Sequence, residues 1–172
     1  MSSLLRRTHN CGELRAEHAG QSVTLQGWVH FARDNGGVVF LVLRDRHGIV
    51  QVTVNEEADD AVMDVARQAR LEYVVEVQGA VRLRGEGLAN KAMATGEVEV
   101  FPTSLRILSR TRPLPFAVNS DKLASEEVRL KHRFLDLRRP ELQKNFVIRH
   151  QITMAARKYL DSLGFLRSRP RC

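Results

Sequence analysis

Hydrophobic and polar residues alternate in three runs between Val23 and Val54, and two short polar segments separate the runs. The separators are Arg-Asp-Asn-Gly-Gly at 33–37 and Arg-Asp-Arg-His-Gly at 44–48. Alternation with period two predicts strands, and glycine-containing separators of this length predict hairpin turns. The residues expected to face inward are Val23, Leu25 and Val29 on the first strand and Val50, Val52 and Val54 on the third. The middle run, 38–43, is apolar on both faces, so the pattern does not say which way Phe40 points.

A helix and two more strands are predicted in the next fifty residues. Residues 58–69 carry apolar side chains at i, i+3, i+4 and i+7, with acids before them and arginines at the end, which is typical of an amphipathic helix. A strand is expected over 73–84, with Val75, Val77, Val81 and Leu83 inward, and a fifth around Val98 and Val100 after a connection over 85–96. Three strands, a helix and two strands predict a mainly β, five-stranded oligonucleotide-binding (OB-fold) barrel.

The character of the chain changes after this barrel. Residues 111–119 read Thr-Arg-Pro-Leu-Pro-Phe-Ala-Val-Asn, and two prolines disfavour a helix there. A basic helix is expected over 125–139, and a longer one over 140–163 with Phe146, Val147, Ile152, Ala156, Leu160 and Leu163 as its apolar stripe. We therefore predict a barrel domain over 1–110, a linker over 111–124 and the helical start of a second domain over 125–172.

Composition narrows the class of protein. The chain has 172 residues, 43% of them hydrophobic, without a run of about 18 apolar residues or an N-terminal signal pattern, so we expect a cytoplasmic protein with no membrane segment. Two cysteines at opposite ends and six scattered histidines fit no metal-binding spacing, so no metal site is expected. The net charge of +7 is uneven: residues 1–110 carry 13 Lys and Arg against 14 Asp and Glu, whereas 111–172 carry 14 against 6.

Basic turns and an aromatic residue on the middle strand of such a barrel favour binding of single-stranded nucleic acid. For each arginine the alternative is an ordinary solvated surface position. For Phe40 the alternative is a place in the core.

Several segments in fixed order resemble the N-terminal part of a bacterial aspartyl-tRNA synthetase, a class II enzyme. They include Arg-Thr-His-Asn-Cys-Gly-Glu-Leu at 7–14, Gly-Trp-Val at 27–29, Arg-Asp at 33–34, Phe40, Leu-Arg-Asp-Arg at 43–46, Gly-Ile-Val-Gln-Val at 48–52, Met-Ala-Thr-Gly-Glu-Val-Glu-Val at 93–100 and Arg-Phe-Leu-Asp-Leu-Arg-Arg-Pro-Glu-Leu at 133–142. The resemblance spans residues 6–166. The related lysyl and asparaginyl enzymes share the barrel, but the first and last of these segments look more like the aspartyl enzyme.

The resemblance implies that the barrel binds the anticodon of a tRNA, for aspartate and in some such enzymes also for asparagine. It implies that Phe40 stacks on the central uracil while Gln51 hydrogen-bonds its edge. The other anticodon-binding residues it implies are Arg33, Arg82, Arg84, Asn90 and Glu99. Where the family commonly has arginines before Arg33, this chain has Phe31 and Ala32, so weaker contact is expected there.

The full-length family uses ATP and Mg²⁺ and is homodimeric. Residues 1–172 include none of its catalytic sheet, so we expect no catalytic residue, no cofactor and no aspartate-dependent pyrophosphate exchange from this chain, which we expect to be monomeric or to aggregate. The chain ends in Arg-Ser-Arg-Pro-Arg-Cys at 167–172, where the resemblance leads us to expect a strand of the type Glu-Val-Glu-Thr-Pro. Deletion of one base from a sequence that codes for that strand would generate the observed ending. We therefore hypothesise a truncated or frameshifted product, with a natural short homologue as the alternative.

Two other functions stay open at this stage. One is a stand-alone OB-fold protein that binds single strands with little sequence preference. The other is an interaction protein whose exposed 140–163 stripe pairs with an intact synthetase subunit.

Overall fold

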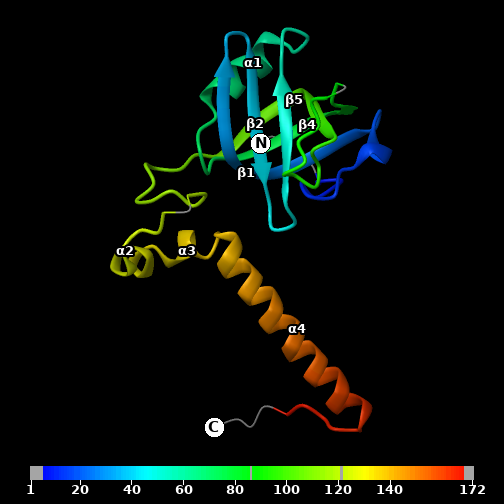
Figure 1. Ribbon diagram of the computed structural model, residues 1–172, viewed down its shortest axis with the longest axis vertical. Coiled ribbons are helices and arrows are strands. Elements are labelled where there is room, and N and C mark those ends of the chain that lie inside the picture. Colours follow the sequence, from blue (N-terminus) through cyan, green and yellow to red (C-terminus); the bar gives the residue numbers. More distant parts are fainter. Residues whose placement is uncertain (1–5, 86, 121, 169–172) are drawn as a thin grey trace. The chain divides into compact units, whose positions relative to one another are not determined.

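The computed structural model describes residues 6–85, 87–120 and 122–168. The chain divides into two compact units, Met1–Pro113 and Leu114–Cys172 (Figure 1). The end of the 167–172 segment, including Cys172, lies outside the described residues.

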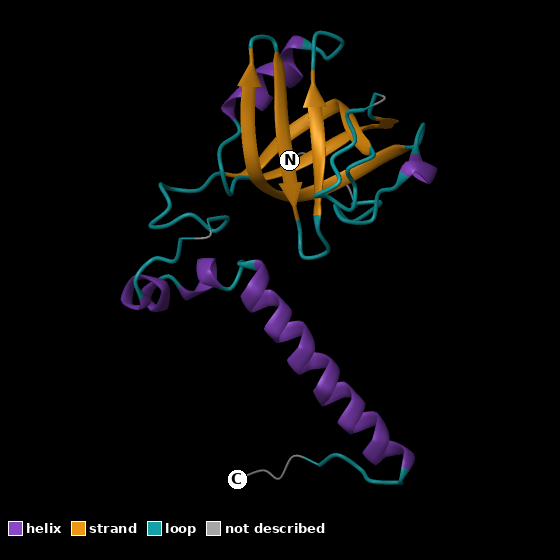
Figure 2. Cartoon of the chain, viewed as in Figure 1, coloured by secondary structure: helices purple, strands orange, loops and turns teal. Residues whose placement is uncertain are grey.

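The first unit is the predicted five-stranded barrel, and this expectation of the fold is confirmed. Its elements are η1 (Ala16–His18), β1 (Ser22–Asn35), β2 (Val38–Arg44), β3 (Ile49–Val54), α1 (Asp60–Gln68), β4 (Val74–Leu83) and β5 (Val98–Ser109). The strands, orange in Figure 2, form a closed barrel. Their order around it is β1-β2-β3-β5-β4. All neighbouring strands are antiparallel except β3 and β5, which meet in parallel at Val52 and Val100.

The length of β1 lets it serve both halves of the barrel. Its first part, from Ser22 to Trp28, pairs with β4, and its second part, from Trp28 to Asn35, pairs with β2. The register with β2 shifts at His30, and such a bulge bends a strand and increases its twist. The bend in β1 therefore lets one strand pair with both β4 and β2, and this pairing closes the barrel.

The first hairpin turn is shorter than the sequence predicts. The expected turn covers 33–37, but Arg33, Asp34 and Asn35 continue β1, and only Gly36 and Gly37 form the turn. Both glycines have positive φ angles, +59° and +118°. A two-residue loop of this kind matches the twist of its strands and needs residues that tolerate positive φ, which explains the extra length of β1.

Valine and leucine side chains fill the barrel. Every residue predicted inward on the first and third strands is buried, as are Val75, Val77, Val81, Val98 and Val100. Leu83 is the exception and the prediction for it is wrong: it is the last residue of β4, and 56% of it is exposed. Cys11 and Leu14, from the segment before β1, are also part of the core.

Helix α1 lies against the barrel wall close to its predicted position. Asp59 caps its N-terminus by accepting a hydrogen bond from the Ala61 N–H at 2.9 Å. Val62 and Ala66, one turn apart, are the buried residues of the helix.

The second unit contains α2 (Glu126–Lys131), α3 (Arg133–Asp136) and α4 (Pro140–Ser162). The prediction of one continuous helix over 125–139 is wrong, because His132 has φ −113° and ψ 44°, outside the helical region. This break allows Leu135 and Asp136 to be buried. Helix α4 begins at Pro140, as predicted, because a first helical position needs no N–H donor.

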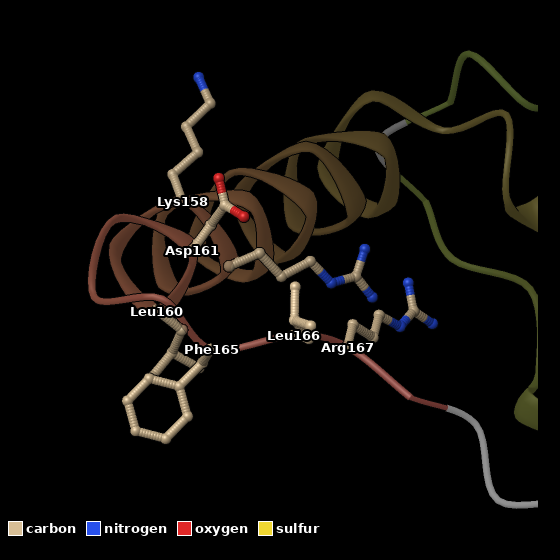
Figure 3. A pocket seen from close by; sticks show the side chains of 7 residues that line it. Lys158, Leu160, Asp161, Phe165, Leu166 and Arg167 are labelled. Atoms are coloured by element: carbon tan, nitrogen blue, oxygen red, sulfur yellow. The ribbon is translucent and has the colours of Figure 1, made fainter.

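The predicted apolar stripe of α4 is exposed along its length, from Phe146 to Leu160. Near the end of the helix, side chains of α4 and of residues 165–167 line a pocket (Figure 3). Among the described helices, none is long and apolar enough to span a membrane.

Candidate nucleic-acid interface

One row of outward-facing positions crosses the barrel from β1 to β4. Arg33 on β1 pairs with Phe40 on β2, and Phe40 pairs with Thr53 on β3. Thr53 hydrogen-bonds Glu99 of β5, and Glu99 pairs with Arg82 of β4. The register therefore places polar and aromatic side chains from all five strands on one continuous surface, which we call the cross-strand row.

The ring of Phe40 is not in the barrel core. Its neighbours along β2, Val39 and Leu41, are buried, whereas Phe40 is partly exposed. Because successive side chains of a strand point to opposite faces, the ring of Phe40 lies on the outer face. An aromatic face accessible to solvent is the element that unstacked bases need.

Gln51, Thr53 and Glu99 form a hydrogen-bonded group next to Phe40. The Gln51 amide nitrogen donates to Glu99 Oε2 at 3.0 Å and to Thr53 Oγ1 at 3.2 Å, and the Thr53 hydroxyl donates to the same Glu99 oxygen. All three side chains lie on neighbouring outer-face positions of β3 and β5. The group holds the Gln51 amide in a fixed orientation beside the aromatic ring.

Arg82 makes two contacts at the far end of the row. Its Nη1 donates to Glu57 Oε2 at 2.8 Å, and its guanidinium carbon lies 4.3 Å from the ring centroid of Phe101. The hydrogen bond and the charge of Arg82 lower the pKa of the Glu57 carboxyl below its usual value. Arg82 and Glu57 are both about half exposed, so the pair borders solvent.

Arg84 has hydrogen-bonding capacity that the described residues do not use. Its backbone N–H donates to the Glu97 carbonyl at 2.9 Å, but its side-chain Nε and Nη2 are buried without a hydrogen-bond partner. A charged donor that is shielded from water and unpaired costs free energy, which an anionic acceptor would recover.

Asn90 lies in the connection between β4 and β5 and acts within its own loop. Its Oδ1 accepts the Ala92 N–H at 3.0 Å. Its backbone N–H donates to the Gly96 carbonyl at 3.0 Å, and its backbone carbonyl accepts the Met93 N–H at 3.1 Å. A side chain at Gly96 would collide with the Asn90 carbonyl oxygen, since a Cβ would lie 1.8 Å from it. No contact in the structure joins the Asn90 side chain to the cross-strand row within the described residues.

Three residues of this surface were not predicted as site residues from the sequence: Thr53, Glu57 and Phe101. The alternation around Val52 and Val100 carries the signal for Thr53 and Phe101, because each lies one step from a core residue and so faces outward. The alternation gives no such indication for Glu57, because Glu57 belongs to an acidic cluster that is typical of the start of a helix.

Arg44, from the second basic turn, is not part of the surface. It is buried at the end of β2, where its Nη2 lies 2.6 Å from Glu72 Oε1 and its Nη1 lies 3.0 Å from His30 Nδ1. Burial, and next the charge of Arg44, lower the pKa of His30, while the Glu72 carboxylate acts in the opposite direction. These groups form a structural cluster, and Arg44 therefore does not reach a ligand on the row.

Two family models match the chain. Residues 23–108 match the OB-fold nucleic acid binding domain, and residues 125–170 match the class II tRNA synthetases for D, K and N. The aspartate–tRNA(Asp/Asn) ligase of Acidobacterium capsulatum is 49% identical over 159 residues, which are 92% of this chain and 26% of the relative. The enzyme of the same name from Desulfosudis oleivorans is 49% identical over 162 residues, 94% of this chain and 27% of the relative. The chain thus spans about a quarter of the length of these curated relatives.

Solved structures show the same arrangement of elements. The asparaginyl-tRNA synthetase from Pyrococcus horikoshii is 29% identical and superposes with a TM-score of 0.80, covering 95% of this chain and 37% of that one. A putative aspartyl-tRNA synthetase from Leishmania major Friedlin is 22% identical and superposes with a TM-score of 0.83, covering 99% of this chain and 36% of that one. This second match shows a likeness of fold.

Proposed function

The chain belongs to the family of OB-fold nucleic acid binding domains and matches the N-terminal part of aspartyl-tRNA synthetases, and from this we propose that its barrel binds the anticodon loop of a tRNA. The observation that carries the proposal is the cross-strand row. A partly exposed aromatic ring on the outer face of β2, flanked by hydrogen-bonding groups on β1, β3, β4 and β5, suits an RNA loop whose bases are unstacked and splayed.

In this proposal Phe40 provides the stacking platform for the central anticodon base. Gln51 is the diagonal neighbour on β3, and its Nε2 is already held by Glu99 and Thr53. Its Oε1 is then the atom that accepts the N3–H of a uracil stacked on the ring. Glu99, an acceptor, suits an exocyclic amino group of an adjacent base.

The arginines supply the charge that an RNA backbone requires. Arg33 is exposed at the β1 end of the row, beside Phe40. Among the described residues, the buried Nε and Nη2 of Arg84 have no hydrogen-bond acceptor, and a phosphate oxygen or a base carbonyl would provide one. Asn90 would contribute through its Nδ2, because its Oδ1 is engaged by the Ala92 N–H.

We propose the tRNAs for aspartate and asparagine as ligands, since those are named for the relatives, and the cytoplasm as the place of action. Full-length class II synthetases use ATP and Mg²⁺. Among the described residues, no three His, Cys, Asp or Glu side chains come together to hold a metal ion. Aminoacylation would belong to the complete enzyme.

The test is filter binding of the 172-residue chain to aspartate tRNA and to a variant with a changed central anticodon base. We expect the variant to bind at least five-fold more weakly, while a tRNA changed at one acceptor-stem base pair binds as the original does. Equal affinity for the anticodon variant would contradict anticodon recognition and would instead support a single-strand binder without sequence preference.

A further inference from the structure

Arg82 and Phe101 form a cation–π pair at the β4 end of the cross-strand row. The guanidinium carbon of Arg82 lies over the Phe101 ring, 4.3 Å from its centroid. Phe101 therefore covers one side of the guanidinium, and the Arg82 side chain is about half exposed. We propose that the other face of the guanidinium is a second base-stacking position, so that a nucleobase, Arg82 and Phe101 form three layers. The inference rests on the proposed binding of an RNA loop.

Glu57 limits the positions that the Arg82 guanidinium can take. Its carboxylate accepts a hydrogen bond from Nη1 of Arg82 at 2.8 Å, and Glu57 comes from the segment between β3 and α1. A guanidinium held by a ring on one face and by a carboxylate at one edge has lost most of its rotational freedom before any ligand arrives. Preorganisation of this kind lowers the entropic cost of binding. Glu57 and Phe101 are thus positioning residues.

The local charge favours an uncharged base over a phosphate at this position. Arg82 is paired with the carboxylate of Glu57, and its partner in the strand register is Glu99, a second carboxylate. One positive charge between two negative ones offers little attraction to a phosphate. A guanidinium plane still stacks on bases, as arginines do in RNA-binding proteins.

The surface beside the pair carries hydrogen-bonding groups. Arg82 and Phe101 line a small pocket together with Thr53, Asn55, Glu57, Ala58 and Pro102. Asn55 is a polar side chain of this pocket that could meet the edge of a base through its Nδ2, since its Oδ1 accepts the Glu57 N–H. Along the row through β3 and β5, Phe40 and Arg82 are three strand spacings apart, a path of roughly 14 Å around the barrel. The base on Arg82 would therefore belong to a different nucleotide from the one on Phe40.

The experiment combines protein variants with abasic RNA. The probe is the anticodon stem-loop of aspartate tRNA, made intact and as a set in which one loop nucleotide at a time lacks its base but keeps its phosphate. Arg82→Lys keeps the charge and removes the plane, and Phe101→Leu removes the ring beneath it. Arg110→Lys is the control, because Arg110 is an exposed arginine directly after β5 that hydrogen-bonds Gln68. Thermal melting confirms that each variant is folded.

We expect Arg82→Lys to weaken binding of the intact hairpin about five-fold or more, at the lower end of the cost of one lost stacked base. Against one abasic hairpin, other than that lacking the central base, the same substitution should have no effect, since the layer it removes is already missing. Phe101→Leu should show the same dependence, and Arg110→Lys should change no affinity.

A phosphate contact gives a different result. If Arg82→Lys weakens all hairpins equally, or none, the stacking position is refuted while anticodon binding stands. If the wild-type chain does not bind the intact hairpin, the proposed function fails and the second stacking position fails with it.

Discussion

Arg44 and Glu72, 28 residues apart in the chain, form a buried ion pair, with 2.6 Å between Nη2 and Oε1 and side chains only 8% and 4% exposed. The pair connects the end of β2 to the residue pair that precedes β4. Glu72 adopts a positive φ of 62°, an uncommon conformation for a residue other than glycine. The contact therefore holds the entry to β4 in a conformation that the backbone alone disfavours.

Removing one partner of this pair should destabilise the barrel. We expect Glu72→Gln to lower the free energy of unfolding by about 3 to 5 kcal/mol, because it leaves the Arg44 charge buried without compensation. Urea denaturation followed by circular dichroism measures the change. Glu57→Gln is the matched control, since it breaks an exposed pair with Arg82 and should alter stability little. Similar small losses in both variants would contradict the assigned role of the buried pair.

The stability of the barrel should depend on pH through His30. Burial and Arg44 lower the pKa of His30 in the folded state below the 6.5 of a free imidazole, so the unfolded chain binds the proton more readily. The contribution is present above pH 6.5 and is lost as pH falls below that value. We expect the free energy of unfolding to decrease between pH 7 and pH 5.5, and to decrease less in His30→Gln. An identical slope in the variant would exclude His30 as the source.

The stacking role of Phe40 gives a direct prediction for binding. Phe40→Ala should cost about 1 to 3 kcal/mol of affinity for the anticodon stem-loop, the value of one stacked base. Because the ring lies outside the core, the thermal midpoint should fall far less than after loss of a core side chain. The control is Phe134→Ala, because Phe134 is an exposed residue of α3. We expect its affinity to be unchanged. Unchanged affinity in Phe40→Ala would remove the ring from the site.

Gly79 lies where the backbone of β5 leaves no space for a side chain on β4. The register between these strands shifts at Gln78 and Gly79, and a Cβ at Gly79 would lie 2.1 Å from the Phe101 carbonyl oxygen. Backbone must therefore move to accept a side chain, and Gly79→Ala should lower the free energy of unfolding by about 3 kcal/mol, the upper range for overpacking. Gly85→Ala, which would meet only the flexible Leu88 side chain, should have a much smaller effect in the same denaturation assay.

The sequence predicts the barrel well because its core uses β-branched residues at strict period two. Val50, Val52 and Val54 show this directly: all are buried, and the outward faces follow from them. Phe40 could not be oriented in this way, because both faces of β2 are apolar and only the closed barrel distinguishes them. Local sequence patterns also could not predict the burial of Arg44, since its partner Glu72 lies in a turn that is distant in the sequence.

Other differences arise where tertiary contacts decide a local choice. His132 interrupts the helix predicted over 125–139 so that Leu135 and Asp136 become buried, which no periodicity in that segment indicates. Glu57 reads as one of several acids before a helix, and only the fold brings it to Arg82. The candidate surface could therefore be predicted strand by strand, while the contacts that hold its side chains could not.

The composition of the cross-strand row has a thermodynamic consequence. Each of the five strands contributes to it, so a chain in which β5 has not yet met β3 has no complete binding surface. An RNA that binds this row recognises only the closed barrel, and by mass action it must shift the unfolding equilibrium of all five strands together. Ligand concentration would then raise the melting temperature and slow amide hydrogen exchange even in β-strand segments that the RNA never touches.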